Sequence, residues 1–450
     1  MSESAGERLM KALIKIGQVL QLGRLFGSRH ARDFTNAPTL PDGAPDALVP
    51  VQEFADKDES QLFHDVMMSF AGDCLKHQKG AGNADHFEDL HWGYTKGLIE
   101  GELKITDVSA LPEPCRLGLF ERPDTYAVVS RPNFLHDGDR IRVSRLSLKL
   151  QTRFDVPNVY TLEGHAREID LLLSEGVRQG QTNDQDGQGF FFRDARQLRY
   201  LGWMQNHKLW AGATLLNSAN SAVLLAQQQV MTDALDTLYK PEHAQKSWDE
   251  KDYYSAGPYA LGGVLVKFAL RSRQDSNSNT RTPGPHGPAR DQGTWFADWR
   301  NGDTPAQFDL CVQLARYGAI RAPQRDKGEP CKAVMASEFT DLVWDEKVSP
   351  FLPVGTLTLQ PGPAPTNPKP WYFQSRDRWY GPDDTQPHAL RFNAWNTLPN
   401  MHPVGQLFRA RKCTHALHRE TRMRHTSNGT PNLSAMCPVI HTSAPKKGTS

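Results

Sequence analysis

The sequence predicts an α+β protein whose main element is an antiparallel, barrel-like β-sheet. Three segments within residues 97–150 alternate apolar and polar side chains with the period of two that characterises strands. A helical pattern follows at residues 213–229, and further strand-like segments come at residues 308–315 and 354–360. Strands that follow one another so closely pair most readily as hairpins and meanders, so we expect an antiparallel sheet.

Residues 1–65 are expected to form an arm that precedes this domain. Residues 7–25 carry an apolar stripe at helical spacing. They predict an amphipathic helix that packs on its own core or on a sister subunit, with a membrane-surface anchor as the alternative. Residues 37–50 are rich in Pro, Gly and Asp and predict an extended lead-in. A helical pattern returns at residues 59–75.

The strands and loops that follow define one large domain, expected over residues 66–430. The expected strands are residues 97–106, 126–130, 142–150, 308–315 and 354–360. Residues 271–293, rich in Ser, Asn, Pro and Gly, predict a loop, and residues 361–370 predict a proline-rich connection. Residues 431–450 are expected to be a polar tail.

Composition sets the broad class of the protein. Hydrophobic residues make up 38% of the 450, including 20 Phe and 10 Trp, which is enough to build a substantial core. The net charge of +1 argues against general binding of nucleic acid. No segment approaches the roughly 18 apolar residues of an integral membrane helix, and the N-terminus lacks the features of a secretory signal. The 6 cysteines have no zinc-type spacing and are expected to be reduced thiols of a cytoplasmic protein.

The most informative segment is the basic stretch at residues 403–424. Arg411 and His415 are four residues apart, which places them on one face of a helix. An imidazole can ligate the iron of a porphyrin, while arginines nearby can meet the anionic propionates. The spacing therefore favours a haem site, with His415 as metal ligand and Arg411 as a cofactor-binding residue.

Four separated segments resemble the haem catalase superfamily, in particular its smaller branch of catalase-related peroxidases. The segments are residues 90–103 with 118–120 and 126–131, then 184–194, then 254–262 with 308–314 and 344–351, and finally 392–396, 402–405 and 409–412. Their order along the chain is the order in the family. The resemblance implies an antiparallel β-barrel with flanking helices that enclose haem.

The axial position departs from the family pattern. In the family a tyrosinate follows an arginine by four residues, whereas here Arg411 stands in the arginine place and His415 stands where the tyrosine would be. A neutral imidazole can ligate iron, although it is a weaker donor than a phenolate. The positive charge of Arg411 favours the neutral imidazole. A site that has lost haem stays open as the alternative.

Three residues compete for the place of the family's distal base. His91 is the first candidate, although the register slips by one or two residues before Gly97. A strict count back from Lys96 gives Tyr94, whose usual pKa of about 10 makes it a poor proton shuttle at neutral pH. His77 imitates the motif locally, but no strand follows it at the right distance. The absence of a distal base stays open as a further alternative.

The remaining site residues also follow from the resemblance. The family's peroxide-orienting asparagine falls on Asp186, which cannot donate a hydrogen bond while ionised, so Asn183 and a turn-capping role for Asp186 stay as alternatives. Arg131 and Arg422 match two propionate-binding arginines of the family. Phe191, the middle residue of three consecutive phenylalanines, would pack near the porphyrin or in a plain core.

The resemblance implies a haem-dependent oxidoreductase that acts on hydrogen peroxide or an organic hydroperoxide. Because the axial tyrosine is absent, peroxidase-like or hydroperoxide-rearranging chemistry stands beside dismutation. A different reading is a non-enzymatic pseudo-catalase that keeps the fold as a binding or scaffold module. Family members are often oligomeric, and an arm of this length could exchange between subunits, so a homo-oligomer is compatible with the sequence.

Overall fold

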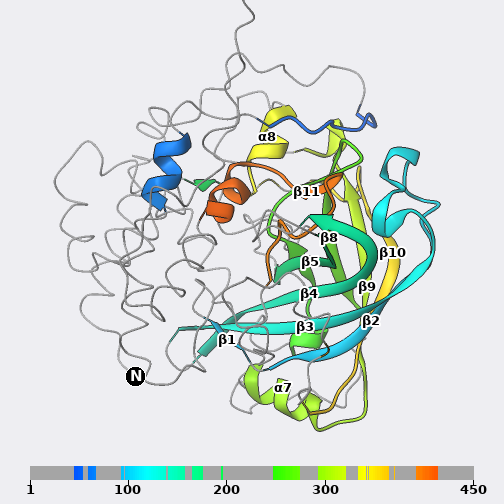
Figure 1. The fold of residues 1–450 in the computed structure, drawn as a ribbon, viewed down its shortest axis with the longest axis vertical. Coiled ribbons are helices and arrows are strands. Elements are labelled where there is room, and N and C mark those ends of the chain that lie inside the picture. The colour runs from blue at the N-terminus through cyan, green and yellow to red at the C-terminus, as the bar shows by residue number, and fades with distance from the viewer. Residues whose placement is uncertain are drawn as a thin grey trace, which may run out of the picture.

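The computed structural model describes the barrel and several segments that cover it (Figure 1). The described residues are 45–53, 59–66, 93–95, 97–137, 140–157, 165–175, 194–195, 247–273, 292–320, 333–340, 342, 344–363, 369 and 392–413. The helices predicted at residues 7–25 and 213–229, and the tail at residues 431–450, lie outside the described residues.

The described strands form a single 11-stranded sheet in which every pairing is antiparallel. The strands are β1 Gly93–Thr95, β2 Ile99–Ile105, β3 Asp124–Asp137, β4 Arg140–Pro157, β5 His165–Glu175, β6 Tyr253–Ser255, β7 Tyr259–Leu261, β8 Val264–Ser272, β9 Ala306–Leu314, β10 Phe351–Leu359 and β11 Met401–Pro403.

Most of the sheet closes on itself. The strand order β8-β6-β5-β4-β3-β2-β10-β9 runs round a barrel of 8 strands, and β9 pairs back to β8 to complete it. β1 lies beside β3, while β7 and β11 continue the sheet from β8. The long, curved β3 and β4 sweep across the barrel in Figure 1. The predicted α+β class, an antiparallel β-barrel with flanking helices, is confirmed.

One face of each strand fills the interior of the barrel. The buried interior side chains include Leu146, Leu148 and Leu150 of β4, Ile169, Leu171 and Leu173 of β5, Val266, Phe268 and Leu270 of β8, and Phe308, Leu310 and Val312 of β9. They recur at every second residue because successive side chains of a strand point to opposite faces of the sheet. Burying each such side chain contributes about 1.5–3 kcal/mol, so this core dominates the stability of the barrel.

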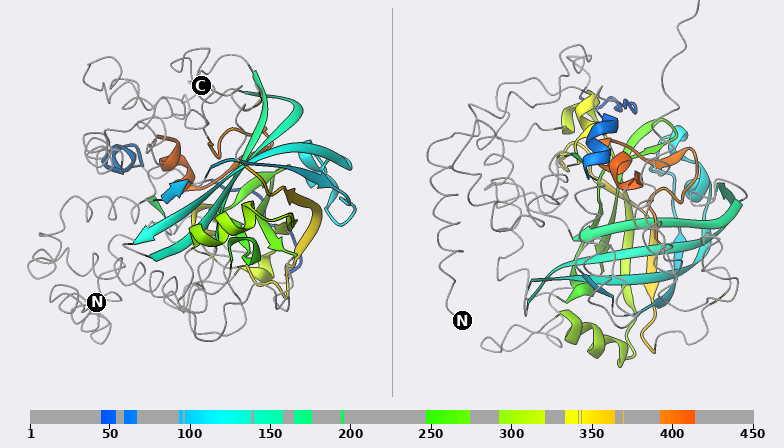
Figure 2. Two further views of the ribbon diagram at one scale, coloured as in Figure 1. Left: turned by 90° about the horizontal axis from the view of Figure 1, so that it is seen from below. Right: turned by 60° about the vertical axis from the view of Figure 1, so that its left-hand side comes forward.

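Helices cover the two ends of the barrel. At one end Trp248 packs edge-on against Phe296 and Trp299 of α7 (Gln292–Arg300), with ring centroids 5.6 and 4.9 Å apart. At the other end α8 (Ala333–Glu338) lies beside the helices at residues 59–66 and 406–413 (Figure 2). The short 3-10 helices are η3 Glu113–Cys115, η4 Gly118–Phe120, η6 Trp248–Glu250 and η7 Tyr317–Ala319.

The extended lead-in predicted before the domain pairs with the barrel in its described part. The Val49 N–H donates to the Ala315 carbonyl at 2.9 Å, and the Val49 carbonyl accepts from Leu265 N–H at 3.2 Å. The Val51 N–H donates to the Gly263 carbonyl at 3.0 Å. The segment therefore pairs with the start of β8 and with the chain just after β9, in agreement with the prediction of an extended chain.

The local patterns located some elements well and missed others. β2, β9 and β10 lie within three residues of their predicted positions, and β3 and β4 are longer than predicted. The helix at residues 59–66 falls inside the predicted helix. β5, β8 and α7 were not predicted, and α7 begins at the end of the expected loop. The β5 sequence alternates only over Glu168-Ile169-Asp170-Leu171 and then continues as the apolar run 171–173, so its period of two is short.

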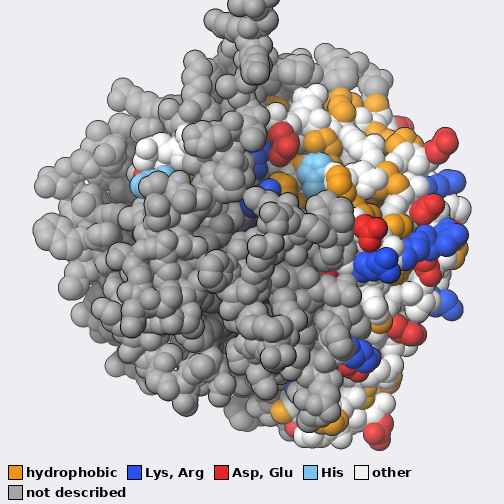
Figure 3. All heavy atoms as spheres, in the orientation of Figure 1, with side chains coloured by type: hydrophobic (Ala, Val, Ile, Leu, Met, Phe, Trp, Pro, Cys, Tyr) orange, Lys and Arg blue, Asp and Glu red, His pale blue; other side chains and the backbone are white. Residues whose placement is uncertain are grey.

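The described surface carries a mixture of charges. Lys and Arg side chains are interspersed with Asp and Glu side chains on the visible face (Figure 3), in keeping with the net charge of +1. None of the helices in the described ranges combines the length and the apolar character that a membrane-spanning helix requires.

Candidate functional site

The outward face of β3, β4 and β5 carries charged side chains that are buried. The registers pair Ser147 with Arg131, and Lys149 with Val129 on one side and Asp170 on the other. These side chains point away from the apolar interior because they alternate with it along each strand. Lys149 and Asp170 have no exposed surface, and only 8% of the surface of Arg131 is exposed. A charged face buried in this way needs an internal partner for every charge.

Lys149, Glu168 and Asp170 form what we term the buried charge cluster. The Lys149 ammonium donates to Glu168 Oε1 at 3.1 Å and to Asp170 Oδ1 at 2.7 Å, and none of the three side chains is exposed. Burial raises the pKa of Asp170, and Lys149 opposes the rise. Burial by itself would lower the pKa of Lys149, but the two carboxylates reverse this and the net direction is upward. The two carboxylates therefore favour the charged form of the Lys149 ammonium.

A short segment, residues 392–396, covers this cluster and is called the strap below. The Asn393 N–H donates to Asp170 Oδ2 at 2.8 Å, and the Asp170 N–H donates to the Asn396 carbonyl at 2.9 Å. The Phe392 ring lies under the Arg131 guanidinium, 4.7 Å from its Cζ, and 5.5 Å from Lys149 Nζ. Cation–π contacts strengthen when they are desolvated, so Phe392 holds both cations against the strap.

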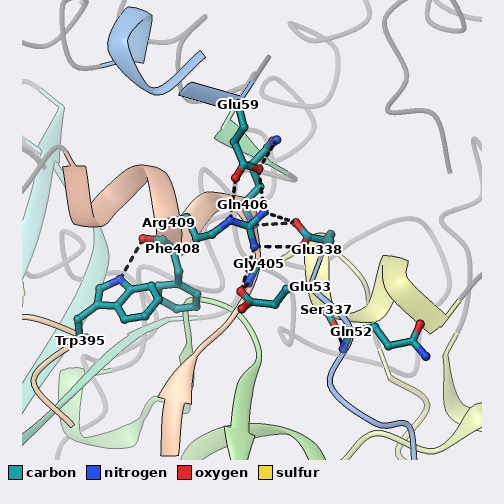
Figure 4. A network of polar contacts seen from close by, with 10 residues as sticks. All are labelled: Gln52, Glu53, Glu59, Ser337, Glu338, Trp395, Gly405, Gln406, Phe408 and Arg409. Atoms are coloured by element: carbon teal, nitrogen blue, oxygen red, sulfur yellow. Dashed lines mark hydrogen bonds and ion pairs between the residues drawn. The ribbon is translucent and has the colours of Figure 1, made fainter. Parts of the chain in front are cut away.

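The strap also contacts the helix at residues 406–413. The Trp395 indole N–H donates to the Phe408 carbonyl at 3.0 Å (Figure 4), and Lys412 Nζ lies 4.6 Å from the Trp395 ring. The Trp395 backbone N–H is itself held by Asn393 Oδ1 at 3.0 Å. Arg411 Cζ lies 5.7 Å from the Phe408 ring. The strap therefore joins the barrel wall to the helix that carries Arg411.

Tyr259 lies between the helix and the barrel. Its ring centroid is 5.5 Å from that of Phe408 and 5.1 Å from that of Phe268, and it is fully buried. Burial raises the pKa of Tyr259, Arg411 opposes the rise, and Asp170 adds to it. The phenol is therefore neutral over the physiological range, and it feels charges from both sides of the candidate site.

Arg409 fastens the same helix to two other segments (Figure 4). Its guanidinium donates to Glu59 Oε1 and Oε2 at 2.7 and 2.9 Å, to Glu338 Oε2 and Oε1 at 3.0 and 3.1 Å, and to Glu53 Oε1 at 2.9 Å. The Gln406 N–H donates to Glu338 Oε2 at 3.0 Å. Hydrogen bonds to these carboxylates raise the pKa of Arg409, which partial burial alone would lower. Bidentate contacts of this kind fix the direction of the guanidinium.

Gly405 begins this helix in a conformation that other residues rarely adopt. Its φ is 96°, and a Cβ atom at this position would lie 2.3 Å from the Ser337 carbonyl oxygen. Its N–H donates to Glu53 Oε1 at 3.2 Å. The close approach of the chain to α8 therefore depends on the absence of a side chain.

Replacing Gly405 by alanine should lower the free energy of unfolding by about 2–4 kcal/mol, through backbone strain and an overpacked contact. Urea unfolding measures the loss. Gly263 is the matched control, because its φ is 81° but a Cβ there would have nothing within 4 Å. Gly263→Ala should therefore cost only the backbone part, about 1–2 kcal/mol. Equal losses in the two variants would show that the contact with Ser337 does not matter.

The structure describes two of the predicted site residues fully. Arg131 lies on β3 and Arg411 on the helix at residues 406–413, and both lie against aromatic rings in or next to the strap. Tyr94 lies in β1 opposite Phe134 of β3, which gives its backbone position only. The other predicted residues, His91, Asp186, Phe191, His415 and Arg422, together with the alternatives His77 and Asn183, lie outside the described residues.

Metal-ligating side chains do not gather within the described ranges. No group of three or more His, Cys, Asp or Glu residues there could hold a metal ion. The buried charge cluster and the strap were missed by sequence reasoning. The signal for the cluster was present in principle, because charged residues alternate with leucine and isoleucine along β4 and β5. The same alternation is typical of a solvated face, so it could not be distinguished from one.

The cysteines depart in part from the expectation of reduced thiols. Cys115 and Cys311 are free and buried. Burial raises the pKa of the Cys115 thiol to about 11 and that of the Cys311 thiol to about 12, which makes both unreactive at neutral pH. Cys413 is disulfide-bonded, so the prediction was wrong for this residue. Spacing alone did not reveal the bridge because disulfide partners are set by the tertiary fold.

Comparisons with known proteins include a distant structural similarity. No protein-family model matches the chain, and no curated protein matches it. A solved structure described as a bacterial catalase is similar to it with a TM-score of 0.39 and 15% sequence identity, over 90% of this chain and 69% of that chain. The barrel described above is established by the strand pairing of this chain and does not depend on that similarity.

Proposed function

We propose that this protein is a haem-binding, catalase-like oxidoreductase that acts on hydrogen peroxide or an organic hydroperoxide. One observation carries the proposal. Arg131 and Arg411 are far apart in the sequence, yet the strap connects the elements that carry them: Arg131 lies on Phe392 of the strap, and Arg411 lies on Phe408 of its own helix. Phe408 in turn accepts the indole hydrogen bond of Trp395. These are two of the arginines that the sequence resemblance marks for haem.

The described donors fit the anionic side of a haem. A guanidinium presents a fixed fork of donors that matches a carboxylate, and it is always charged. Arg131 is 8% exposed and Arg411 is partly buried, so a carboxylate that met either group would be largely shielded from water. Arg131, Arg411 and Arg422 are the residues proposed to hold the cofactor, with Phe191 packed against it.

The iron of a bound haem would supply the redox chemistry on the O–O bond. His415 is proposed as its ligand through a neutral imidazole nitrogen, and the positive charge of Arg411 four residues earlier favours that neutral form. His91 is proposed as the base that takes a proton from one peroxide oxygen and returns it to the other. Tyr94 and Asp186 are the further residues proposed to line this side. A cytoplasmic location and a homo-oligomeric state also stay predictions.

The purified protein should show a Soret band, with a pyridine haemochrome assay that gives close to one haem per chain. His415→Ala should abolish or strongly shift the band because the iron loses its ligand, and His415→Tyr should move it toward that of a tyrosinate-ligated haem. His64 serves as the control histidine because its side chain is 50% exposed on the helix at residues 59–66. His64→Ala should keep the wild-type spectrum.

Two outcomes would count against the proposal. Unchanged spectra in both His415 variants would exclude this histidine as the ligand. A folded, colourless wild-type protein that ignores added hemin would exclude haem chemistry altogether, and would favour the non-enzymatic pseudo-catalase instead.

A further inference from the structure

We propose that Asp170 is a positioning residue which anchors the strap to the barrel and thereby sets the places of both Arg131 and Arg411. The consequence for haem rests on the proposed function, whereas the anchoring itself does not. Asp170 lies on β5 with no exposed surface. Asp170 precedes Arg411 by 241 residues in the sequence, and this separation is why only tertiary contacts can connect them.

The two oxygens of Asp170 serve two different donors. Oδ1 accepts from the Lys149 ammonium at 2.7 Å, and Oδ2 accepts from the Asn393 backbone N–H at 2.8 Å. Only an ionised carboxylate offers an acceptor on both sides, because an amide would turn its NH₂ group toward one of the two donors. The Asp170 backbone adds a further tether through its N–H to the Asn396 carbonyl.

The anchored strap reaches both arginines through short contacts. Its first residue, Phe392, lies under Arg131, and its fourth residue, Trp395, bonds the Phe408 carbonyl of the helix that carries Arg411. Asn393 connects these two ends, since its N–H bonds Asp170 and its side chain holds the Trp395 N–H. Release of the Asn393 N–H would therefore loosen both ends of the strap at once.

Glu168 provides a matched control. It accepts from the same lysine at 3.1 Å and lies two residues before Asp170 on the same face of β5. Glu168→Gln and Asp170→Asn remove the same charge from the same buried cluster. Asp170→Asn alters the acceptor of the Asn393 N–H, whereas Glu168→Gln leaves that acceptor in place.

Hydrogen–deuterium exchange on the full chain without haem tests the anchor. In Asp170→Asn the amides of the strap should exchange about tenfold faster, the fold-change that corresponds to about 1.4 kcal/mol. In Glu168→Gln they should stay within about twofold of wild type. Unchanged strap exchange in Asp170→Asn, or equal acceleration in both variants, would overturn the proposal.

A neutral background keeps the test decisive if Asp170→Asn does not fold. In K149M/E168Q/D170N the introduced amide oxygen is free to accept the Asn393 N–H, and no charge stays buried, so strap exchange should be close to wild type. K149M/E168Q/D170L has a similar shape but no acceptor, and its strap should exchange about tenfold faster. Equal exchange in these two variants would also overturn the proposal.

The haem spectrum separates positioning from mere stability. Asp170→Asn should shift or broaden the Soret band of the haem-loaded protein because both arginines lose their fixed places, whereas Glu168→Gln should not. An unaltered band in a variant with accelerated strap exchange would contradict the link to the arginines. If wild type takes up no haem, the proposed function fails, and the exchange experiment still decides whether Asp170 anchors the strap.

Discussion

Replacing Arg409 by alanine should lower the free energy of unfolding by about 3–5 kcal/mol, because it leaves buried carboxylates without their cation. The Arg409 side chain is 12% exposed, and its partners Glu59 and Glu338 are 10% and 0% exposed. Glu338 would keep its bond from the Gln406 N–H but lose two charge-assisted contacts. The helix at residues 406–413 would then be held more weakly to α8 and to the helix at residues 59–66, through the hydrogen bonds of Gln406 to Glu338 and Glu59.

Urea unfolding of the variant and the wild type measures this loss. Arg153 is the matched control, since it also contacts two carboxylates, Glu121 at 3.2 Å and Asp124 at 2.6 Å, but is 35% exposed. Arg153→Ala should cost less than about 1 kcal/mol because water screens exposed pairs. Comparable losses in the two variants would mean that burial does not strengthen the Arg409 contacts.

Replacing Lys149 by methionine should cost about 3–5 kcal/mol at pH 7, and the cost should shrink as the pH falls. The direction of this pH dependence follows from Asp170. Burial raises the pKa of its carboxyl above the ordinary value of about 3.9. A carboxyl with a raised pKa in the folded state stabilises the fold most below the unfolded value, and this contribution is lost as the pH rises through the folded pKa. Removal of Lys149 deletes the charge that opposes this rise in the pKa of Asp170. The pH range over which stability falls therefore extends to higher pH.

Unfolding experiments at pH 4, 5, 6 and 7 follow this dependence. The penalty of Lys149→Met relative to wild type should grow steadily across the series. The neutral variant K149M/E168Q/D170N should show little of this trend because it has no buried charge in the cluster. A penalty that does not change with pH would mean that the cluster carries no net charge in the variant.

The strands were predictable where one face is apolar and the other is wet. β2 follows this rule along its length and β9 follows it over its first half, and their alternation located them. β5 does not, because Glu168 and Asp170 on its outward face are as buried as Ile169 and Leu171 on the inward face. Closure of the barrel was inferred from strand spacing and the family resemblance. Local patterns do not report which strands pair, such as β8 with β9.

The candidate site likewise combines local features, which could be predicted, with contacts between distant segments, which could not. The spacing of Arg411 and His415 is local, so the helix could be predicted, and the described part at residues 406–413 agrees with it. The nearness of Arg131 to Phe392 is not local and had no signal in the pattern. Lys149 and Asp170 have the appearance of solvent-facing charges, and they are buried only because residues 392–396 return to cover them.

Closure of the barrel has a consequence for synthesis of the chain. Ile105 of β2 pairs with Gly355 of β10, which the ribosome adds 250 residues later. At about 5–20 residues per second, β2 waits tens of seconds for its neighbour, and its edge is open during that time. Open edges recruit other strands. Nascent chains should therefore depend on chaperones until β10 has left the exit tunnel, and chains that stop before it should aggregate.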